Sequence, residues 1–295
     1  MRAAAISGPG TSAKDLKPFQ HDTKTNWLFR LPANSAEVDA ILIFGGDGTV
    51  HRHLPELVKL LLPVLVVPCG SGNDFARALK LGRIPASLEA WRKFCSGSEN
   101  VRSIDLGVIT PLTAEHCAAQ APALPRYFCC VGSVGLDAEI SRRANRLPRW
   151  LRAHGGYALS LLPALSSFTP VRMKISVLHD EHRDFVVDRK PIMVAACANA
   201  PSYGGGMKIA PRAQLDDGKL DVCIIKHMDK MKLFCLFPSV YFGRHLNVPQ
   251  VEYSQAERLG LETDEPHDVY ADGEYICQTP IEVSVARGAL RVIVP

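Results

Sequence analysis

Carboxylate side chains recur in three glycine-containing turns of this sequence. They are Asp47 in GGDGTV, Asp272 and Glu274 in ADGEY, and Asp216, Asp217 and Asp221 in DDGKLD. A carboxylate in such a turn can bind a hard cation or accept the proton of a reacting hydroxyl group. An Asp-Gly pair is also an ordinary turn, because glycine adopts positive φ angles at no steric cost. Each turn is therefore either a candidate site or a plain loop.

The first glycine loop, residues 45 to 50, directly follows the apolar run AILIF at 40 to 44. Such a run is typical of a strand buried on both faces. The segment after the loop is expected to form a helix, and Pro55 would interrupt it early. Glycines let backbone N–H groups approach a phosphate, and the helix would point its positive end at that anion. Asp47 would then hold a metal ion or a proton.

A second glycine loop, PCGSGND at 68 to 74, follows another apolar run, and a helical pattern continues after it. Asn73 is a natural N-cap for that helix, and Asp74 falls in its first turn. A capped strand-turn-helix crossover would explain these residues without any ligand. Two such loops at neighbouring strand ends of one sheet, however, are a more specific signal than either loop alone.

The spacing of apolar runs predicts two domains of different class. Residues 1–103 alternate short strands with helices, which predicts a doubly wound α/β domain with a parallel sheet. Residues 104–295 are rich in β runs and turns, which predicts an antiparallel β-sandwich whose last strand could return to the first domain. Helical insertions are expected at about 136 to 167 and 228 to 243, and a surface hairpin loop at 111 to 125.

The composition narrows the class of protein. The chain has 295 residues, a net charge of +4 and a hydrophobic fraction of 47%. This composition is typical of a globular protein, and the net charge is far below that of a dedicated nucleic-acid binder. Its nine cysteines include no Cys-x-x-Cys pair, so reduced thiols in the cytoplasm are expected. No run of 18 apolar residues occurs, which predicts a soluble protein or one peripheral to a membrane.

The two glycine loops together resemble the catalytic domain of the diacylglycerol kinase family, which includes the sphingosine kinases and bacterial lipid kinases. The resemblance rests on GGDGT followed by P-x-G-[ST]-G-N-D, and it extends nearly end to end. The later blocks that resemble the family are VGSVGLDAEI at 131 to 140, the stretch 199 to 222, and VYADGEYICQTPIEV at 269 to 283. The resemblance implies an α/β domain, a β-sandwich domain, and ATP with Mg²⁺ in the cleft between them.

The resemblance also implies roles for individual residues. The nucleotide phosphates would lie against the first loop, and the second loop would complete the nucleotide site. The implied cofactor-binding residues are Gly45, Gly46, Gly48, Thr49, Gly70, Ser71, Gly72, Asn73 and Asp74. Asp272 is expected to act as general base toward a lipid hydroxyl, assisted by Glu274, and Asp47 is the competing candidate. Asp216, Asp221 and the carbonyl of Leu220 are implied metal ligands.

The favoured interpretation is an ATP-dependent kinase that phosphorylates a hydroxyl of diacylglycerol or a related lipid, at a membrane on the cytoplasmic side. The basic and apolar segments 141 to 156 and 227 to 245 could contact anionic lipid, or could be a solvated helix face and ordinary core. One alternative is a kinase of a soluble substrate, similar to NAD kinase. Another is a nucleotide-binding protein without catalysis, which the first strand end AISGPGTS favours, because relatives carry Asn-Pro-x-x-Gly there. Neither the lipid nor the oligomeric state, for which a homodimer is one option, can be read from the sequence.

Overall fold

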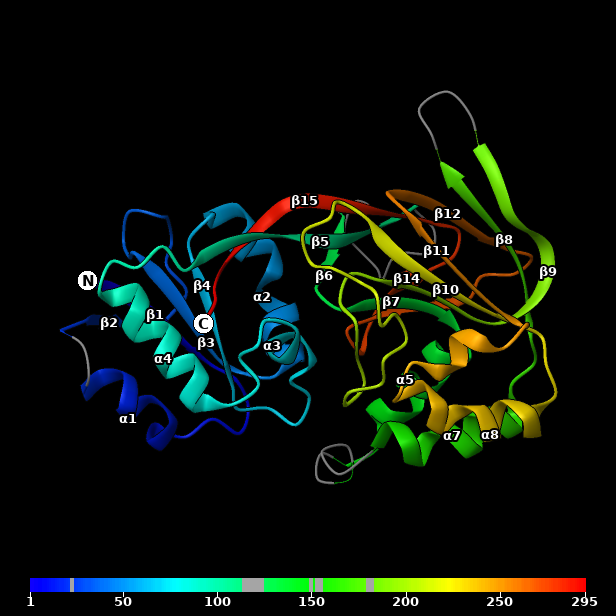
Figure 1. Cartoon of the computed structure of the whole chain (residues 1–295), viewed down its shortest axis with the longest axis horizontal. Helices are drawn as coiled ribbons and strands as arrows, with labels where there is room; N and C mark the ends of the chain where they lie inside the picture. The colour runs from blue at the N-terminus through cyan, green and yellow to red at the C-terminus, as the bar shows by residue number, and fades with distance from the viewer. Residues whose placement is uncertain (22–23, 113–124, 149–150, 152–155, 179–182) are drawn as a thin grey trace. The chain divides into compact units, whose positions relative to one another are not determined.

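The computed structural model describes residues 1–21, 24–112, 125–148, 151, 156–178 and 183–295 (Figure 1). The chain divides into two compact units. Unit 1 comprises Met1–Leu106 and Arg287–Pro295, and unit 2 comprises Gly107–Ala286. Strands β5 (Val101–Pro111) and β15 (Ile281–Ile293) each contribute residues to both units. The sequence placed the boundary at 103 and 104; in the structure the chain passes from unit 1 to unit 2 after Leu106 and returns at Arg287.

Unit 1 contains a parallel sheet in the order β2-β1-β3-β4, with the end of β15 beside β4. Its strands are β1 (Arg2–Ser7), β2 (Asn26–Leu28), β3 (Ala40–Gly45) and β4 (Val64–Pro68). All six residues of β3 are buried, which is expected of a central strand covered on both faces. The apolar run that precedes the first glycine loop therefore fixes that loop at the carboxyl edge of the sheet.

Four helices accompany this sheet: α1 (Ala13–His21), α2 (Asp47–Leu60), α3 (Asp74–Ala78) and α4 (Ile84–Cys95). Figure 1 shows α1 and α4 together on one face and α2 and α3 toward the other, the doubly wound arrangement that the sequence predicted. The expected interruption at Pro55 was wrong, because α2 continues through that residue to Leu60. Proline removes only one backbone donor, and the buried Leu54 and Leu57 hold the helix on the sheet.

Unit 2 is an antiparallel β structure, which confirms the predicted β-sandwich class. The strand order is β14-β13-β7-β9-β8-β12-β15, with β10 and β11 continuing from β9 and β6 pairing with β5. The remaining strands are β6 (Arg126–Phe128), β7 (Val131–Gly135), β8 (Val171–Leu178), β9 (Arg183–Ala198), β10 (Leu220–Lys226), β11 (Val251–Ala256), β12 (Arg258–Thr263), β13 (Asp268–Ala271) and β14 (Glu274–Gln278). Alternating side chains from these strands form one buried apolar core.

Helices α5 (Leu136–Arg146), α7 (Gly156–Ser167) and α8 (Lys230–Val240) lie within unit 2, with a short 3-10 helix, η2 (Arg244–Asn247), after α8. They occupy the two predicted helical insertions. Asp229 caps α8 by accepting hydrogen bonds from the backbone N–H groups of Met231 and Lys232. Among the described residues, no helix is long and apolar enough to span a bilayer. The predicted hairpin loop at 111 to 125 falls mostly at 113–124, outside the described residues.

Candidate functional site

Three loops meet at the carboxyl edge of the unit 1 sheet. The loop after β1 is joined to β3, because the backbone N–H of Gly8 and the hydroxyl of Thr11 both donate to the carbonyl of Phe44, at 2.7 and 2.8 Å. The loop after β4 is joined to β3 by the N–H of Cys69, which donates to the carbonyl of Gly45 at 3.1 Å. The first glycine loop therefore lies between the other two.

The two predicted glycine loops touch through their backbones. A Cβ atom on Gly70 would lie 2.6 Å from the backbone nitrogen of Gly46, a separation that real Cβ atoms do not show. A Cβ atom on Gly45 would lie 2.5 Å from Oγ1 of the buried Thr49. Glycine is required at these positions because backbone and the Thr49 side chain occupy the space that a side chain would need. Gly8 meets Thr49 in the same way, and its only signal in the sequence is its place directly after a strand.

Asp47 links the first loop to helix α3. Its carboxylate accepts hydrogen bonds from the backbone N–H groups of Asp74 at 2.9 Å and Phe75 at 3.0 Å. Its own N–H donates to the carbonyl of Gly72 at 3.0 Å. These contacts satisfy donors at the start of α3 that would otherwise lack partners. Asp47 thus performs the capping that the sequence assigned to Asn73.

Asn73 instead closes the second glycine loop on itself. Its side-chain amide donates to the carbonyl of Gly70 at 2.7 Å and accepts from the N–H of Gly70 at 3.2 Å, and it makes no side-chain cap to α3. Asp74 is buried and pairs with Arg77 at 2.6 Å, while Ser71 is exposed at the tip of the loop. The loop is held in shape by side-chain contacts, and its exposed tip is available to a ligand.

The chemistry of this edge fits the phosphates of a nucleotide. Gly46 is the N-cap of the 14-residue helix α2, and no side chain caps it. The positive end of a helix dipole and closely spaced backbone N–H groups attract an anion. The glycines that bring the loops together also leave the edge free of side chains that would exclude phosphate. The residues that would line it are Gly46, Gly48 and Thr49 of the first loop and Ser71 and Gly72 of the second.

Asp272 occupies a two-residue hairpin turn between β13 and β14, where it has a φ of 50° and Gly273 a φ of 83°. The turn alternative was therefore correct as local structure. The carboxylate folds back onto the start of β7: Oδ1 accepts from the N–H groups of Cys130 at 2.8 Å and Val131 at 3.2 Å. Oδ2 accepts from the N–H of Cys129 at 2.8 Å and from the thiol of Cys129 at 3.3 Å. Three backbone donors and one weak thiol donor thus orient this carboxylate.

Glu274 lies two residues beyond Asp272, but its side chain is exposed at the start of β14. The adjacent carbonyl of Gly273 accepts a hydrogen bond from the side chain of Asn145 on α5 at 2.6 Å, which anchors the hairpin. The structure therefore orients Asp272 tightly and leaves Glu274 toward solvent. The expected assistance by Glu274 stays a prediction.

Asp221 is buried at the start of β10. The Tyr253 hydroxyl donates to Oδ1 at 2.6 Å, and the Gln255 side chain donates to Oδ2 at 3.2 Å and also lies 3.4 Å from Oδ2 of Asp217. Burial raises the pKa of Asp221 and the charge of Asp217 raises it further, while the two hydrogen bonds and Arg212 oppose the increase. A cation between Asp217 and Asp221 would relieve this repulsion, so the oxygen donors fit Mg²⁺.

The predicted ligand Asp216 is exposed, whereas Asp217, which was not among the predicted ligands, shares Gln255 with Asp221. Leu220 precedes Asp221 at the first position of β10, where it pairs with Ala256 of β11. Its side chain is fully buried. The geometry therefore favours the pair Asp217 and Asp221 over the pair Asp216 and Asp221.

An apolar cavity of about 50 Å³ lies among α5, α7 and α8 in unit 2. Asp137 in its wall is buried and accepts hydrogen bonds from the hydroxyls of Ser133, Tyr157 and Tyr203. Burial raises the pKa of Asp137, and those hydrogen bonds oppose the increase. The apolar lining comprises Leu136, Ile140, Leu161, Val194, Met207, Ile209, Ile225, Leu233, Leu236, Phe237 and Val240. At about 50 Å³ the cavity is smaller than the roughly 300–1,000 Å³ of typical small-molecule sites.

Asp137 lies inside the block VGSVGLDAEI, and no role was predicted for it from the sequence. The sequence signal that could have indicated a role for Asp137 is its position shortly after a buried strand that ends in glycine. Gly135 has a φ of 99°, and a Cβ atom there would lie 2.5 Å from the carbonyl of Met193, so the sharp turn that aims Asp137 inward needs glycine. The tyrosines that contact Asp137 come from distant segments and gave no signal.

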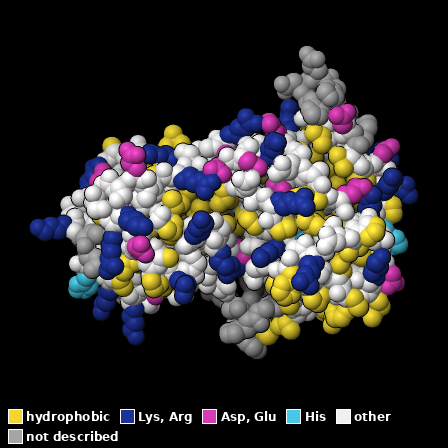
Figure 2. All heavy atoms as spheres, in the orientation of Figure 1, with side chains coloured by type: hydrophobic (Ala, Val, Ile, Leu, Met, Phe, Trp, Pro, Cys, Tyr) yellow, Lys and Arg dark blue, Asp and Glu magenta, His cyan; other side chains and the backbone are white. Residues whose placement is uncertain are grey.

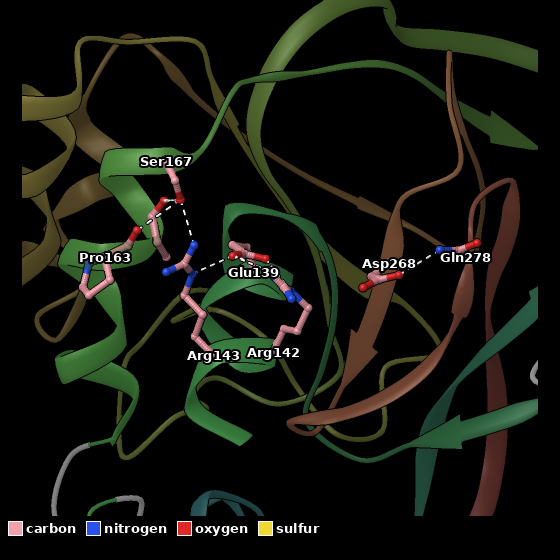
Figure 3. A network of polar contacts seen from close by, with 8 residues as sticks. Glu139, Arg142, Arg143, Pro163, Ser167, Asp268 and Gln278 are labelled. Atoms are coloured by element: carbon pink, nitrogen blue, oxygen red, sulfur yellow. Dashed lines mark hydrogen bonds and ion pairs between the residues drawn. The ribbon is translucent and has the colours of Figure 1, made fainter. Parts of the chain in front are cut away.

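A larger cavity, of about 400 Å³, adjoins the other side of α5 and is lined by Glu139, Arg142, His267 and Asp268 among others. Figure 3 shows how Glu139 is held between Arg142 and Arg143, with Arg143 also donating to Ser167 at 2.8 Å. Although burial raises the pKa of Glu139, the hydrogen bonds from both arginines lower it overall. This network ties α5 to the end of α7 and so stabilises the wall of the smaller cavity.

Comparison with known proteins shows the family to which this chain belongs. Residues 13–109 match the diacylglycerol kinase catalytic domain, and residues 130–294 match the YegS C-terminal NAD kinase beta sandwich-like domain. A diacylglycerol kinase of Mycobacterium tuberculosis is 30% identical over 263 residues, which cover 87% of this chain and 77% of that protein. A diacylglycerol kinase of Bacillus subtilis is 27% identical over 261 residues, covering 88% and 78%.

Solved structures share the fold. A diacylglycerol kinase of Bacillus anthracis aligns with a TM-score of 0.66 at 18% identity and covers 100% of this chain and 97% of its own. An NAD kinase of Archaeoglobus fulgidus in complex with ATP aligns with a TM-score of 0.50 at 13% identity, covering 99% and 93%. The chain belongs to the diacylglycerol kinase catalytic-domain family of lipid kinases.

Proposed function

We propose that this protein is an ATP-dependent kinase that transfers the γ-phosphate to a hydroxyl group of diacylglycerol or a closely related lipid. The observation that carries the proposal is the backbone contact between the two glycine loops, with Asp47 linking the first loop to α3. It brings two glycine loops together at the N-terminus of α2, in a chain with relatives named diacylglycerol kinase. The Archaeoglobus fulgidus NAD kinase was solved in complex with ATP, which supports ATP as the donor.

Asp272 is the proposed general base. Its Oδ2 has one backbone N–H donor and one thiol donor, and the thiol of Cys129 is the weaker of the two. A lipid hydroxyl that replaced this thiol contact would give its proton to Oδ2 while its oxygen attacks the γ-phosphorus. The bond from that phosphorus to the ADP oxygen then breaks. The two N–H bonds to Oδ1 keep the carboxylate in place throughout.

Asp47 has a different proposed role. Each of its oxygens accepts a backbone N–H of α3, so it fixes the relative position of the two glycine loops. Loss of that contact would displace the donors that bind phosphate. We therefore assign Asp47 to positioning the nucleotide site and Asp272 to proton transfer.

Mg²⁺ is the proposed metal. Asp217 and Asp221 would hold it in unit 2, with the carbonyl of Leu220 as a further oxygen. A bound cation supplies charge neutralisation at this acidic turn. The chain's own contribution is the hydrogen bonding of Tyr253 and Gln255, which orients Asp221.

Membrane contact is proposed at the surface of α7 and α8, which pack against each other. Large apolar side chains are exposed there: Leu159 and Leu162 on α7, Met231 and Phe234 on α8, and Phe242 after α8. Figure 2 shows apolar side chains gathered over this region with lysines and arginines among them. Lys230, Lys232 and Arg244 are exposed around the patch, and α7 contains no charged residue. Exposed apolar side chains ringed by cations suit an anionic bilayer.

The surface of α7 and α8 includes only part of the two segments that were predicted from the sequence to contact lipid. Of the segment 141 to 156, residues 149–150 and 152–155 lie outside the described residues, and Arg142 and Arg143 bind Glu139 rather than projecting freely. In the segment 227 to 245, Met231 and Phe234 are exposed, while Phe237 stacks on Tyr157. The proposed membrane surface is therefore α7 and α8 rather than the arginine-rich stretch.

Vesicle co-sedimentation tests the surface. The double variant Leu159→Ser with Leu162→Ser should pellet with phosphatidylglycerol vesicles at least several-fold less than the parent chain. Phe29→Ser removes an equally exposed apolar side chain (63%) from unit 1 and should pellet like the parent. Equal loss in both variants, or no loss in either, would contradict the proposed surface.

The activity itself is tested with ATP carrying a radiolabelled γ-phosphate, offered with Mg²⁺ to a panel of lipids in mixed micelles and to NAD. Label in diacylglycerol or a related lipid supports the proposal, and the labelled lipid names the substrate. Label in NAD alone would replace the proposal with an NAD kinase-like activity. ATP binding without any labelled product would favour a nucleotide-binding protein that does not catalyse.

A further inference from the structure

Unit 2 contains two adjacent thiols beside the carboxylate of Asp272. One ligand atom each from Cys129, Cys130 and Asp272 lies within 4.8 Å of the others, and both cysteines are buried. The eight cysteines within the described part of the chain form no disulfide, so both thiols can act as ligands. Two cysteine sulfurs and one carboxylate oxygen form a ligand set that binds a thiophilic divalent cation more tightly than it binds Mg²⁺.

The separation of the Cys129 sulfur from the Asp272 carboxylate is close to that of two donors in a tetrahedral site. A zinc ion with a Zn–S bond of about 2.3 Å and a Zn–O bond of about 2.1 Å separates the two donors by about 3.6 Å. The Cys129 sulfur and Oδ2 of Asp272 are 3.3 Å apart, so a shift of a few tenths of an ångström would admit the ion.

The hydrogen bonds around Asp272 would survive binding. The thiol contact of Cys129 is the interaction that the ion would replace, since the ion takes the position of the thiol proton on Oδ2. Oδ1 would keep its two N–H donors and Oδ2 its N–H donor from Cys129. Ligating carboxylates in metal sites are commonly oriented by such outer hydrogen bonds. The hydrogen bonds that would orient Asp272 as a metal ligand are therefore already present in the fold.

We propose that Cys129, Cys130 and Asp272 form a binding site for a thiophilic divalent cation such as Zn²⁺, with a solvent molecule as fourth ligand. Binding releases the thiol protons and forms two metal–sulfur bonds and one metal–oxygen bond, with no change of oxidation state. Bound metal would occupy the oxygen to which the lipid hydroxyl gives its proton, so it would inhibit phosphoryl transfer. That consequence, unlike the binding itself, rests on the proposed function.

Cadmium, whose thiolate complexes absorb in the ultraviolet, is the probe. All titrations use the full chain with Cys235→Ser, which removes an exposed thiol of α8. The parent should show a thiolate-to-cadmium band that saturates at one Cd²⁺ per chain. Cys129→Ala and Cys130→Ala should each lose half or more of the band, and Asp272→Asn should weaken binding at least tenfold. Cys223→Ala, which removes a buried thiol of β10, should match the parent.

Circular dichroism separates misfolding from ligand loss, and Cys129→Ser provides a second, nearly isosteric variant. An unchanged band in folded Cys129→Ala and Cys130→Ala would overturn the site. A kinase assay with Zn²⁺ forms a separate arm: saturable inhibition of the parent that Cys130→Ala relieves is expected, and inhibition unaffected by that substitution would overturn the inhibitory role. If no lipid is phosphorylated in any condition while the cadmium band is present, the proposed function fails and the metal site stands.

Discussion

The carboxylate of Asp47 accepts the backbone N–H of Asp74 at 2.9 Å, across 27 positions of sequence. This bond joins the two glycine loops of unit 1 into one structure. It also explains why a residue that resembles a catalytic aspartate contributes to stability: its second oxygen accepts the N–H of Phe75, so the start of α3 depends on it.

Asp47→Ala should therefore lower the free energy of unfolding by about 0.5–2 kcal/mol, the range observed for loss of a helix cap. Chemical denaturation of the parent and the variant measures this. ATP affinity should fall as well, because the loops lose their mutual position. A variant with unchanged stability and lost activity would instead assign Asp47 to proton transfer.

Gly46→Ala should remove ATP binding, since its new methyl group would collide with the backbone of the second loop at Gly70 and Gly72. Gly82→Ala is the matched control, because its methyl group would meet a flexible Arg77 side chain at 3.2 Å. Fluorescence titration with a labelled ATP analogue compares the two. Similar ATP affinity in both variants would show that close loop contact is not needed for the nucleotide.

Asp137→Asn should change the pH dependence of stability. Burial raises the pKa of Asp137, so the folded protein holds this proton more tightly than the unfolded chain does. The free energy of unfolding of the parent should therefore fall as the pH rises above the ordinary value of 3.8, and level off above the raised pKa.

The asparagine variant has no such proton, and its amide can still accept from both tyrosines. The difference between the two unfolding free energies should thus shift in favour of the variant as the pH rises. Denaturant unfolding at a series of pH values provides the measurement. Parallel curves for parent and variant would rule out a titrating Asp137.

Asp221→Asn tests the magnesium site. Mg²⁺ should raise the melting temperature of the parent, because it binds the folded acidic turn, and the effect should be absent or much smaller in the variant. Asp216→Asn serves as the control, since its side chain is exposed. A loss of the magnesium effect in both variants would restore the ligand set that the sequence implied, and an undiminished effect in Asp221→Asn would contradict the site.

Much of the fold could be predicted because its signals are local. The buried run before Gly45 and the glycines after it indicate a strand that ends in a tight loop, and the structure has both. The α/β and β-sandwich classes followed from the same patterns. The predicted interruption of helix α2 at Pro55 was wrong because the tertiary packing of Leu54 and Leu57 outweighs one missing backbone donor.

The details of the site depend on contacts that no local pattern reveals. Asp47 rather than Asn73 caps α3, and Asp217 rather than Asp216 lies with Asp221 at Gln255. Two of the three hydrogen-bond donors to Asp137, Tyr157 and Tyr203, lie 20 and 66 positions away in sequence. Such pairs are set by the sheet and helices that carry them, so only the three-dimensional structure identifies them.

The central claim is that Asp272 accepts the proton of a lipid hydroxyl during transfer of phosphate from ATP. The most direct measurement compares the rate of label transfer from ATP radiolabelled in the γ-phosphate to diacylglycerol, in mixed micelles, for the parent and for Asp272→Asn. We expect a rate at least about 100-fold lower in the variant, with ATP affinity unchanged, because a general base contributes that much or more. Equal rates for folded parent and folded variant would contradict the claim.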